Sequence, residues 1–324
     1  MTNRILQCLD EGRMPWRSDA SSPPILPKNG ISGRQYHGVN IPLLLAQSFD
    51  DERWTTILMA NKEGWRVRRG EKGTPLYAHR MRDVQTGEDP ATGEPVLSKR
   101  PVLCRHVLFN FSQIEGAPAK VRSESPGGDI SADTAARIDA LLESMGVTIE
   151  CRKGVPRFAI EEDTIHMPAP ESYPSLGAYY NRLLHETAHW TGHPDRMNRA
   201  VGRDHASPDY VKEELVADLT TTMLCAKLGV PCALEDHPSF AEGYRELLSG
   251  SKRALWMATR EAERVANQIL GHDVSCREEI REEAAAMAAD ASAGEFGETF
   301  DASEFEFNEE LMIDAHAATA GYQP

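Results

Sequence analysis

Apolar and polar residues follow two different periods along this chain, and the period predicts where helices and strands lie. Apolar residues spaced three to four positions apart indicate a helix with one buried face, whereas strict alternation indicates a half-buried strand. Helical spacing, helix-forming residues and cap signals predict helices at residues 2–12, 40–49, 55–63, 131–145, 175–189, 210–220, 239–248 and 251–270. Strands are predicted at residues 65–69, 74–79, 101–110, 147–151, 157–160 and 164–167.

This order of elements predicts an α+β fold in two domains. Residues 1–122 mix helices and strands, with a loop rich in Ser, Pro and Gly at 17–30 and a polar hairpin at 83–99. Residues 123–130 are the predicted linker, since Gly, Pro and Ser interrupt the pattern there. Residues 131–275 form the second domain, in which a small antiparallel sheet precedes a pair of helices.

Composition adds a division of charge to this picture. The 324 residues have a formal net charge of −15, but residues 1–122 hold 18 Lys and Arg against 13 Asp and Glu. The last segment, 276–324, holds 13 acidic and two basic residues; we expect a partly disordered acidic tail with one short helix at 278–289. The asymmetry suggests that the first domain meets a polyanion and the second does not.

Other features of the sequence narrow the class of protein. No run of eighteen apolar residues exists, and the N-terminus lacks the apolar core of a signal peptide, so we expect a cytoplasmic protein with no membrane partner. Six cysteines show no C-x-x-C pairing, which favours reduced thiols over disulfides or a cysteine metal site.

The candidate chemistry lies in the pentad His-Glu-Thr-Ala-His at residues 185–189. On a helix, His185 and His189 share one face and can bind one metal ion, while Glu186 is placed to act as general base on a metal-bound water. Behind a small sheet, such a helix is typical of the zincin fold, in which an edge strand holds an extended substrate.

A catalytic site of this kind needs a third protein ligand. Glu214 is the first candidate, because the segment 210–220 is a second amphipathic helix in which Asp218 lies four residues further on. Glu214 would then bind the metal, and Asp218 would accept a hydrogen bond from a ligand histidine. Asp195 is the alternative, since it completes a metzincin-like H-E-x-x-H-x-x-G-x-x-D pattern, although no clear Met-turn follows. We expect one divalent ion, Zn²⁺ in preference to Mn²⁺.

The candidate nucleic-acid surface lies in the first domain. Basic residues there are interleaved with aromatic ones, a combination that holds the backbone and stacks the bases of single-stranded DNA. The predicted contacts are Arg34, Tyr36, Lys62, Trp65, Arg66, Arg68, Arg69 and Lys72. In a strand, Arg66 and Arg68 lie on one side, and Trp65 lies on the other. Trp65 and Trp54 are therefore equally well explained as core residues.

Several of these motifs together resemble one known family. The segments 185–193 and 213–218 are similar to the metallopeptidase-like domain of ArdC-type antirestriction proteins, and the segments 31–41, 64–75 and 108–116 are similar to the single-stranded-DNA-binding domain of that family. The resemblance covers about residues 1–270. It implies a protein of a plasmid or phage that accompanies incoming DNA and helps it to escape host restriction.

Three functions fit these observations. The first is a protein that binds single-stranded DNA and carries a metal-dependent peptidase. The second is a DNA-binding protector whose zincin domain is catalytically silent. The third is a metallopeptidase that cleaves a specific host or phage protein, such as a restriction or regulatory protein. The presence of Glu186 favours retained chemistry, because a merely structural zinc site has no use for a general base.

Overall fold

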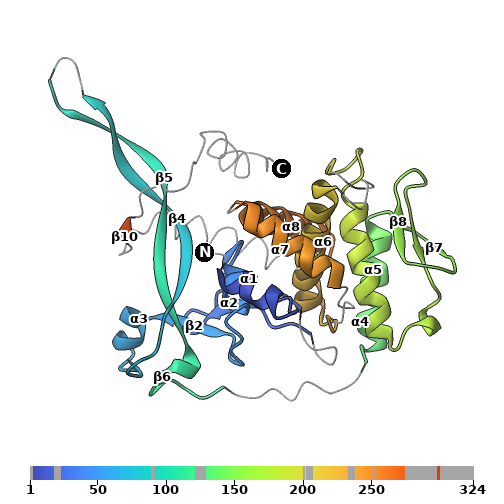
Figure 1. Ribbon diagram of the computed structural model, residues 1–324, viewed down its shortest axis with the longest axis horizontal. Helices are drawn as coiled ribbons and strands as arrows, with labels where there is room; N and C mark the ends of the chain where they lie inside the picture. The colour runs from blue at the N-terminus through green and yellow to red at the C-terminus, as the bar shows by residue number, and fades with distance from the viewer. Residues whose placement is uncertain are drawn as a thin grey trace. The chain divides into compact units, whose positions relative to one another are not determined.

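The computed structural model describes residues 3–17, 23–88, 92–120, 129–199, 201, 207–232, 238–251, 253–273 and 298–299. These residues form two compact units. The first joins residues 1–74 to residues 109–281, and the second contains residues 75–108 with the short strand β10 (Glu298–Thr299) (Figure 1). The predicted helix at 278–289 and the remainder of the acidic tail lie outside the described residues.

Short elements make up the N-terminal part of the first unit. They are α1 (Asn3–Asp10), β1 (Lys28–Asn29), α2 (Asn40–Leu45), β2 (Arg53–Thr56), α3 (Ile57–Lys62), β3 (Arg66–Val67), the 3-10 turn η1 (Phe111–Gln113) and β6 (Ile114–Glu115). β1 pairs with β2 in parallel, and β3 pairs with β6 in antiparallel orientation. The helix predicted at 55–63 begins late because Thr56 caps it, accepting a hydrogen bond from Met59 N.

A small apolar cluster holds this region together. Ala60, Phe111 and Ile114 are buried, and Trp65 and Val67 pack against them. The chain approaches the Phe111 ring so closely at Gly30 that a Cβ there would lie 2.2 Å from it. Only a glycine fits this position without a shift of the ring.

The region that follows the predicted linker begins with α4 (Ala132–Ser144) and a three-stranded sheet. The strands β7 (Thr148–Cys151), β8 (Arg157–Ala159) and β9 (Thr164–Met167) lie in the order β7-β9-β8. β8 and β9 are antiparallel, but β7 and β9 are parallel. The predicted purely antiparallel sheet is therefore wrong. β9 turns back from β8 and inserts between the two earlier strands, so that it runs in the direction of β7.

Helices form the rest of the first unit. After the turn η2 (Pro170–Ser172) come α5 (Leu176–Trp190), α6 (Pro208–Leu228), α7 (Pro238–Gly250) and α8 (Ala254–Leu270). α6 lies between α5 and α8 and contacts both (Figure 1). It runs eight residues beyond its predicted end at 220 and stops at Gly229, whose φ is +75°. Most residues of its second half are buried, so no polar face marks that half as amphipathic.

The second unit is built on a long hairpin. The predicted strands at 74–79 and 101–110 extend through the predicted excursion as β4 (Thr74–Glu88) and β5 (Pro95–Asn110), which pair with each other (Figure 1). β10 pairs with β5 in antiparallel orientation and places Glu298 opposite Arg105. Among the described residues, no helix combines the length and the apolar character needed to cross a membrane.

Candidate metal centre

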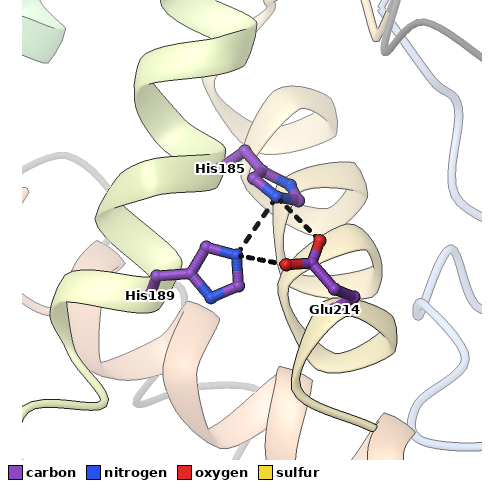
Figure 2. Close-up of side chains that lie close together, drawn as sticks. All are labelled: His185, His189 and Glu214. Carbon is purple, nitrogen blue, oxygen red and sulfur yellow. Dashed lines mark hydrogen bonds and ion pairs between the residues drawn. The ribbon is translucent and has the colours of Figure 1, made fainter. Parts of the chain in front are cut away.

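Helix α5 carries the two histidines into the interior of the first unit. Ser175 caps its first turn by accepting a hydrogen bond from Ala178 N, and Asp129 accepts hydrogen bonds from Leu176 N and Gly177 N. His185 and His189 follow on the side of α5 that faces α6 (Figure 2). Their Nε2 atoms lie 3.2 Å apart, and both residues are buried.

Glu214 on α6 completes the cluster, as the sequence predicts. Its Oε2 lies 3.5 Å from His185 Nε2 and its Oε1 lies 3.4 Å from His189 Nε2 (Figure 2). The three ligand atoms all lie within 4.8 Å of one another. Two imidazole nitrogens and one carboxylate oxygen that face a common point form a donor set suited to a catalytic zinc-type ion, with one position left for water or substrate. The three residues form a site for a divalent metal.

The alternative third ligand does not join this cluster. Asp195 is 87% exposed, and its carboxylate lies 3.7 Å from His193 Nδ1. Helix α5 ends at Trp190, before this pair is reached. The metzincin-like pattern is therefore a coincidence of spacing.

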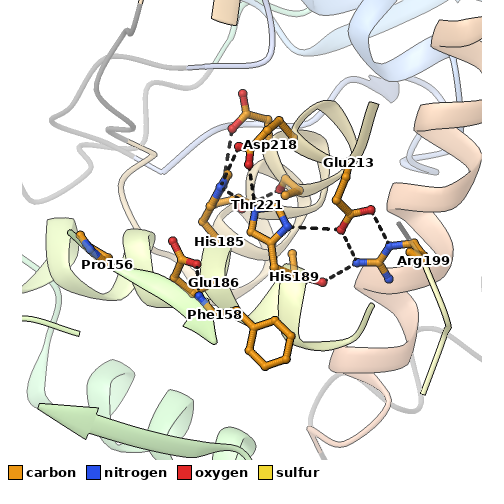
Figure 3. A network of polar contacts seen from close by, with 12 residues as sticks. Pro156, Phe158, His185, Glu186, His189, Arg199, Glu213, Asp218 and Thr221 are labelled. Carbon is orange, nitrogen blue, oxygen red and sulfur yellow. Dashed lines mark hydrogen bonds and ion pairs between the residues drawn. The ribbon is translucent and has the colours of Figure 1, made fainter. Parts of the chain in front are cut away.

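The other nitrogen of each ligand histidine faces a carboxylate. Asp218 Oδ1 lies 3.5 Å from His185 Nδ1, where the sequence predicts a supporting group. Glu213, which the sequence reasoning missed, lies with Oε1 3.3 Å from His189 Nδ1 (Figure 3). A carboxylate on Nδ1 keeps the proton on that nitrogen and leaves the Nε2 lone pair for the metal.

Arg199 holds Glu213 in turn. It donates from Nε to Oε2 at 3.0 Å and from Nη2 to Oε1 at 2.9 Å, a two-bond contact that fixes the plane of the carboxylate (Figure 3). Arg199 also donates to Ala188 O and Thr191 Oγ1 at the end of α5. The only sequence signal for the role of Glu213 is its position next to Glu214, and this position does not show which glutamate binds the metal and which supports His189.

The pKa values of the buried ligands Glu214 and His189 depend strongly on one another. Burial favours the neutral carboxyl form of Glu214, but the two imidazoles outweigh it and hold the pKa of that carboxyl far below its usual range. Burial likewise lowers the pKa of His189, yet Glu214 and Glu213 raise it overall to about 10. The surrounding carboxylates thus favour the protonated form of His189.

Glu186, the predicted general base, follows His185 on helix α5. Its Oε2 accepts a hydrogen bond of 2.8 Å from Phe158 N on β8, and its Oε1 lies 2.7 Å from Arg182 Nη2 (Figure 3). Its side chain is 3% exposed. The two oxygens thus have a backbone N–H and a guanidinium as partners.

Most of the predicted DNA contacts fall in the segment 62–72 around β3, whereas Arg34 and Tyr36 lie between β1 and α2 in the sequence. Arg34, Lys62, Arg66, Arg69 and Lys72 are exposed, and Tyr36 is half-buried. Arg68 is about half exposed, lies 3.2 Å from Glu71 and also donates to Ser112 O. Trp65 is half-buried, with its ring edge-on to Phe111 at 5.4 Å. Trp54 is 2% exposed and is a core residue.

The two parts of the chain match two family models. Residues 1–109 match the N-terminal domain of the anti-restriction factor ArdC, and residues 136–261 match a zincin-like metallopeptidase. The HExxH helix, the Glu214 ligand on the next helix and the preceding sheet define the same zincin-like class.

Solved structures support both assignments at once. The metal-free crystal structure of the antirestriction protein ArdC from plasmid R388 is 28% identical, covers 85% of this chain and 96% of its own, and superposes with a TM-score of 0.68. The Mn(II)-bound structure of that protein is 27% identical and gives a TM-score of 0.65. The chain therefore combines an ArdC N-terminal domain with a zincin-like metallopeptidase domain, and its fold is similar to that of an ArdC-type antirestriction protein.

Other relatives match most of this chain in sequence. A DNA primase TraC from Escherichia coli is 30% identical over 312 residues, which is 91% of this chain but 28% of TraC. The chain spans only 20% of a second TraC. A protein designated y4eC from Sinorhizobium fredii is 26% identical over 280 residues and is covered for 89% of its length.

Proposed function

We propose that this protein binds single-stranded DNA, hydrolyses peptide bonds at the metal centre, and in this way helps DNA of a plasmid or phage to escape host restriction. The observation that carries the peptidase part is the buried cluster of His185, His189 and Glu214 beside Glu186 and the strand β8. The resident ion is Zn²⁺, which this donor set favours, with Mn²⁺ as the alternative.

The residues of the chain divide the catalytic work. A bound metal ion would polarise the substrate carbonyl and acidify a water molecule. Glu186 would accept the proton of that water and pass it to the leaving amine. Arg182, on the preceding turn of α5, forms an ion pair with this carboxylate and orients it.

Strand β8 supports an extended peptide as the substrate. It is an edge strand, since β9 covers only one of its sides. Phe158 lies opposite Ile165 of β9 in the register, and its N–H donates to Glu186. A substrate strand added along β8 would offer its own carbonyl to Phe158 N and would release Glu186 Oε2 toward the reaction. Substrate binding and activation of the base are thereby linked.

The N-terminal domain supplies the proposed DNA contact. Its exposed cations Lys62, Arg66, Arg69 and Lys72 lie on neighbouring positions of one segment and would neutralise phosphates. The relatives support this role in general terms, because ArdC of R388 is an antirestriction protein and TraC is a DNA primase.

The test separates shielding of DNA from proteolysis. Glu186→Gln keeps the size of the side chain and leaves the three metal ligands intact. Transfer of unmodified DNA into a restricting host is measured with the wild-type and variant proteins, together with metal content and single-stranded DNA binding. Lost protection with intact DNA binding supports a peptidase that acts on a host protein. Full protection would assign antirestriction to DNA binding alone and refute a part for the peptidase in it.

A further inference from the structure

Asp218, which faces the metal ligand His185, has two oxygens with different partners. Its Oδ1 faces His185 Nδ1 at 3.5 Å. Its Oδ2 accepts a hydrogen bond of 2.9 Å from the hydroxyl of Tyr244 and lies 2.8 Å from Arg17 Nη2. The side chains of Asp218 and Arg17 are only 2% and 9% exposed. Oδ2 is thus bound by Arg17 and Tyr244, and Oδ1 faces the imidazole of His185.

The backbone before Arg17 is fixed to the same helix. Thr222, one turn after Asp218 on α6, donates from Oγ1 to Trp16 O at 2.8 Å. The Trp16 side chain is 1% exposed, and its ring lies 5.8 Å from that of Tyr244. Arg17 is therefore anchored through its neighbour rather than reaching Asp218 from a free loop.

Burial makes the charge of Arg17 important. A buried carboxylate is costly unless a cation and hydrogen bonds compensate it, and a guanidinium remains charged at any physiological pH. With Oδ2 bound by Arg17 and Tyr244, the Asp218 carboxylate is held with Oδ1 facing His185 Nδ1. In this orientation Oδ1 is placed to accept a hydrogen bond from Nδ1–H of His185, an arrangement that directs the Nε2 lone pair to the metal.

We propose that Arg17 is a positioning residue of the metal centre, which acts on His185 through Asp218. The N-terminal segment, which lies far from α5 and α6 in sequence, thus completes the support of the metal ligands. The segment that matches the zincin-like family, residues 136–261, does not contain this group. The inference rests on the metal site and not on the proposed peptidase activity.

Metal binding by the full-length protein tests the proposal directly. Arg17→Met keeps the apolar stem of the side chain and removes the charge. The Kd for Zn²⁺ should rise about tenfold, at the lower end of what loss of an outer partner costs, and the visible absorption of bound Co²⁺ should shift. The control is Arg13→Met, since Arg13 is 49% exposed and pairs with Glu11 at the surface. It should change neither quantity.

A double-mutant cycle distinguishes positioning from general damage. In an Asp218→Asn background the carboxylate is gone, so Arg17→Met should alter the Kd for Zn²⁺ by less than about twofold. Equal losses in both backgrounds, or no loss in either, would overturn the proposal. Arg17→Lys, which retains the cation, provides a second reading if the Met variant fails to fold. Its Kd should stay within a few-fold of wild type, and a tenfold loss that persists in Asp218→Asn would again overturn it.

Discussion

The metal centre and the basic segment 62–72 show two ways in which a sequence can carry function. At the metal centre, each ligand is buried, and each ligand histidine has its second nitrogen next to a carboxylate. In the basic segment, the cations are exposed, and one of them, Arg68, is engaged by Glu71 and Ser112. Helical spacing imposes a geometry on the first set, whereas no comparable rule orders the second.

The largest expected effect is on turnover by Glu186→Gln. The amide cannot accept the proton, so hydrolysis of an unfolded protein such as casein should fall by about 10²–10⁴-fold. Metal content should not change, because Glu186 is not among the ligands. Glu171→Gln, at an exposed position before α5, is the matched control. Unaltered hydrolysis in Glu186→Gln would mean that another group takes the proton.

The next effect is on metal content. Replacing Glu214 by Gln removes the anionic ligand and should weaken metal binding more than the 10–100-fold that loss of an outer partner costs. Asp195→Asn should leave it unchanged, since Asp195 is exposed and away from the cluster. Elemental analysis and competition with a chelator measure both. The reverse order would restore the metzincin-like assignment.

Glu213→Gln should have a smaller effect on the same quantity. The amide leaves His189 Nδ1 without an anionic partner and Arg199 without its two-bond contact, so the metal Kd should rise by about 10–100-fold. Lys212→Ala on the same helix, where the side chain is 55% exposed, should not change it. An unchanged Kd in Glu213→Gln would show that the carboxylate orients nothing.

The same contrast explains which parts of the site and of the fold could be predicted from the sequence. His185, His189 and Glu214 could be assigned because spacing on two helices fixes which side chains share a face. Arg17 and Arg199 could not, because each reaches the site through tertiary packing that no local period records. The same limit explains the sheet, where β9 inserts between β7 and β8 although neither strand's own pattern specifies its partner.

Metal affinity should also depend on pH. In the metal-free protein, Glu214 and Glu213 overcome the effect of burial and raise the pKa of His189 to about 10, so a metal ion must displace a proton at any pH below that value. The Kd should therefore rise about tenfold for each unit of decrease in pH, including the range from 8.5 to 6.5. An ordinary histidine, with a pKa near 6.5, would give a flat profile there. Calorimetric titration at three pH values distinguishes the two.

The smallest expected effect is on the salt dependence of DNA binding by the basic segment. The full-length protein should bind single strands better than duplex, and the logarithm of its affinity should fall linearly with the logarithm of salt concentration. Arg66→Ala together with Arg69→Ala should reduce that slope by about 1.4 if each side chain neutralises one phosphate of a single strand. Arg68→Ala should reduce it less, because its guanidinium already contacts Glu71 and Ser112 O.

The metal centre offers the internal control for this experiment, since neither arginine touches it. Metal content of the double variant should equal that of the wild type, so a changed slope would be assigned to DNA contact and not to misfolding. An unchanged salt slope in the double variant, or a preference for duplex, would show that these cations are only hydrated surface charges and do not contact single-stranded DNA. In that case the basic composition of the segment would have been misleading. If the slope changes only when Arg66 and Arg69 are replaced, exposure in the fold, and not charge in the sequence, determines which residues bind DNA.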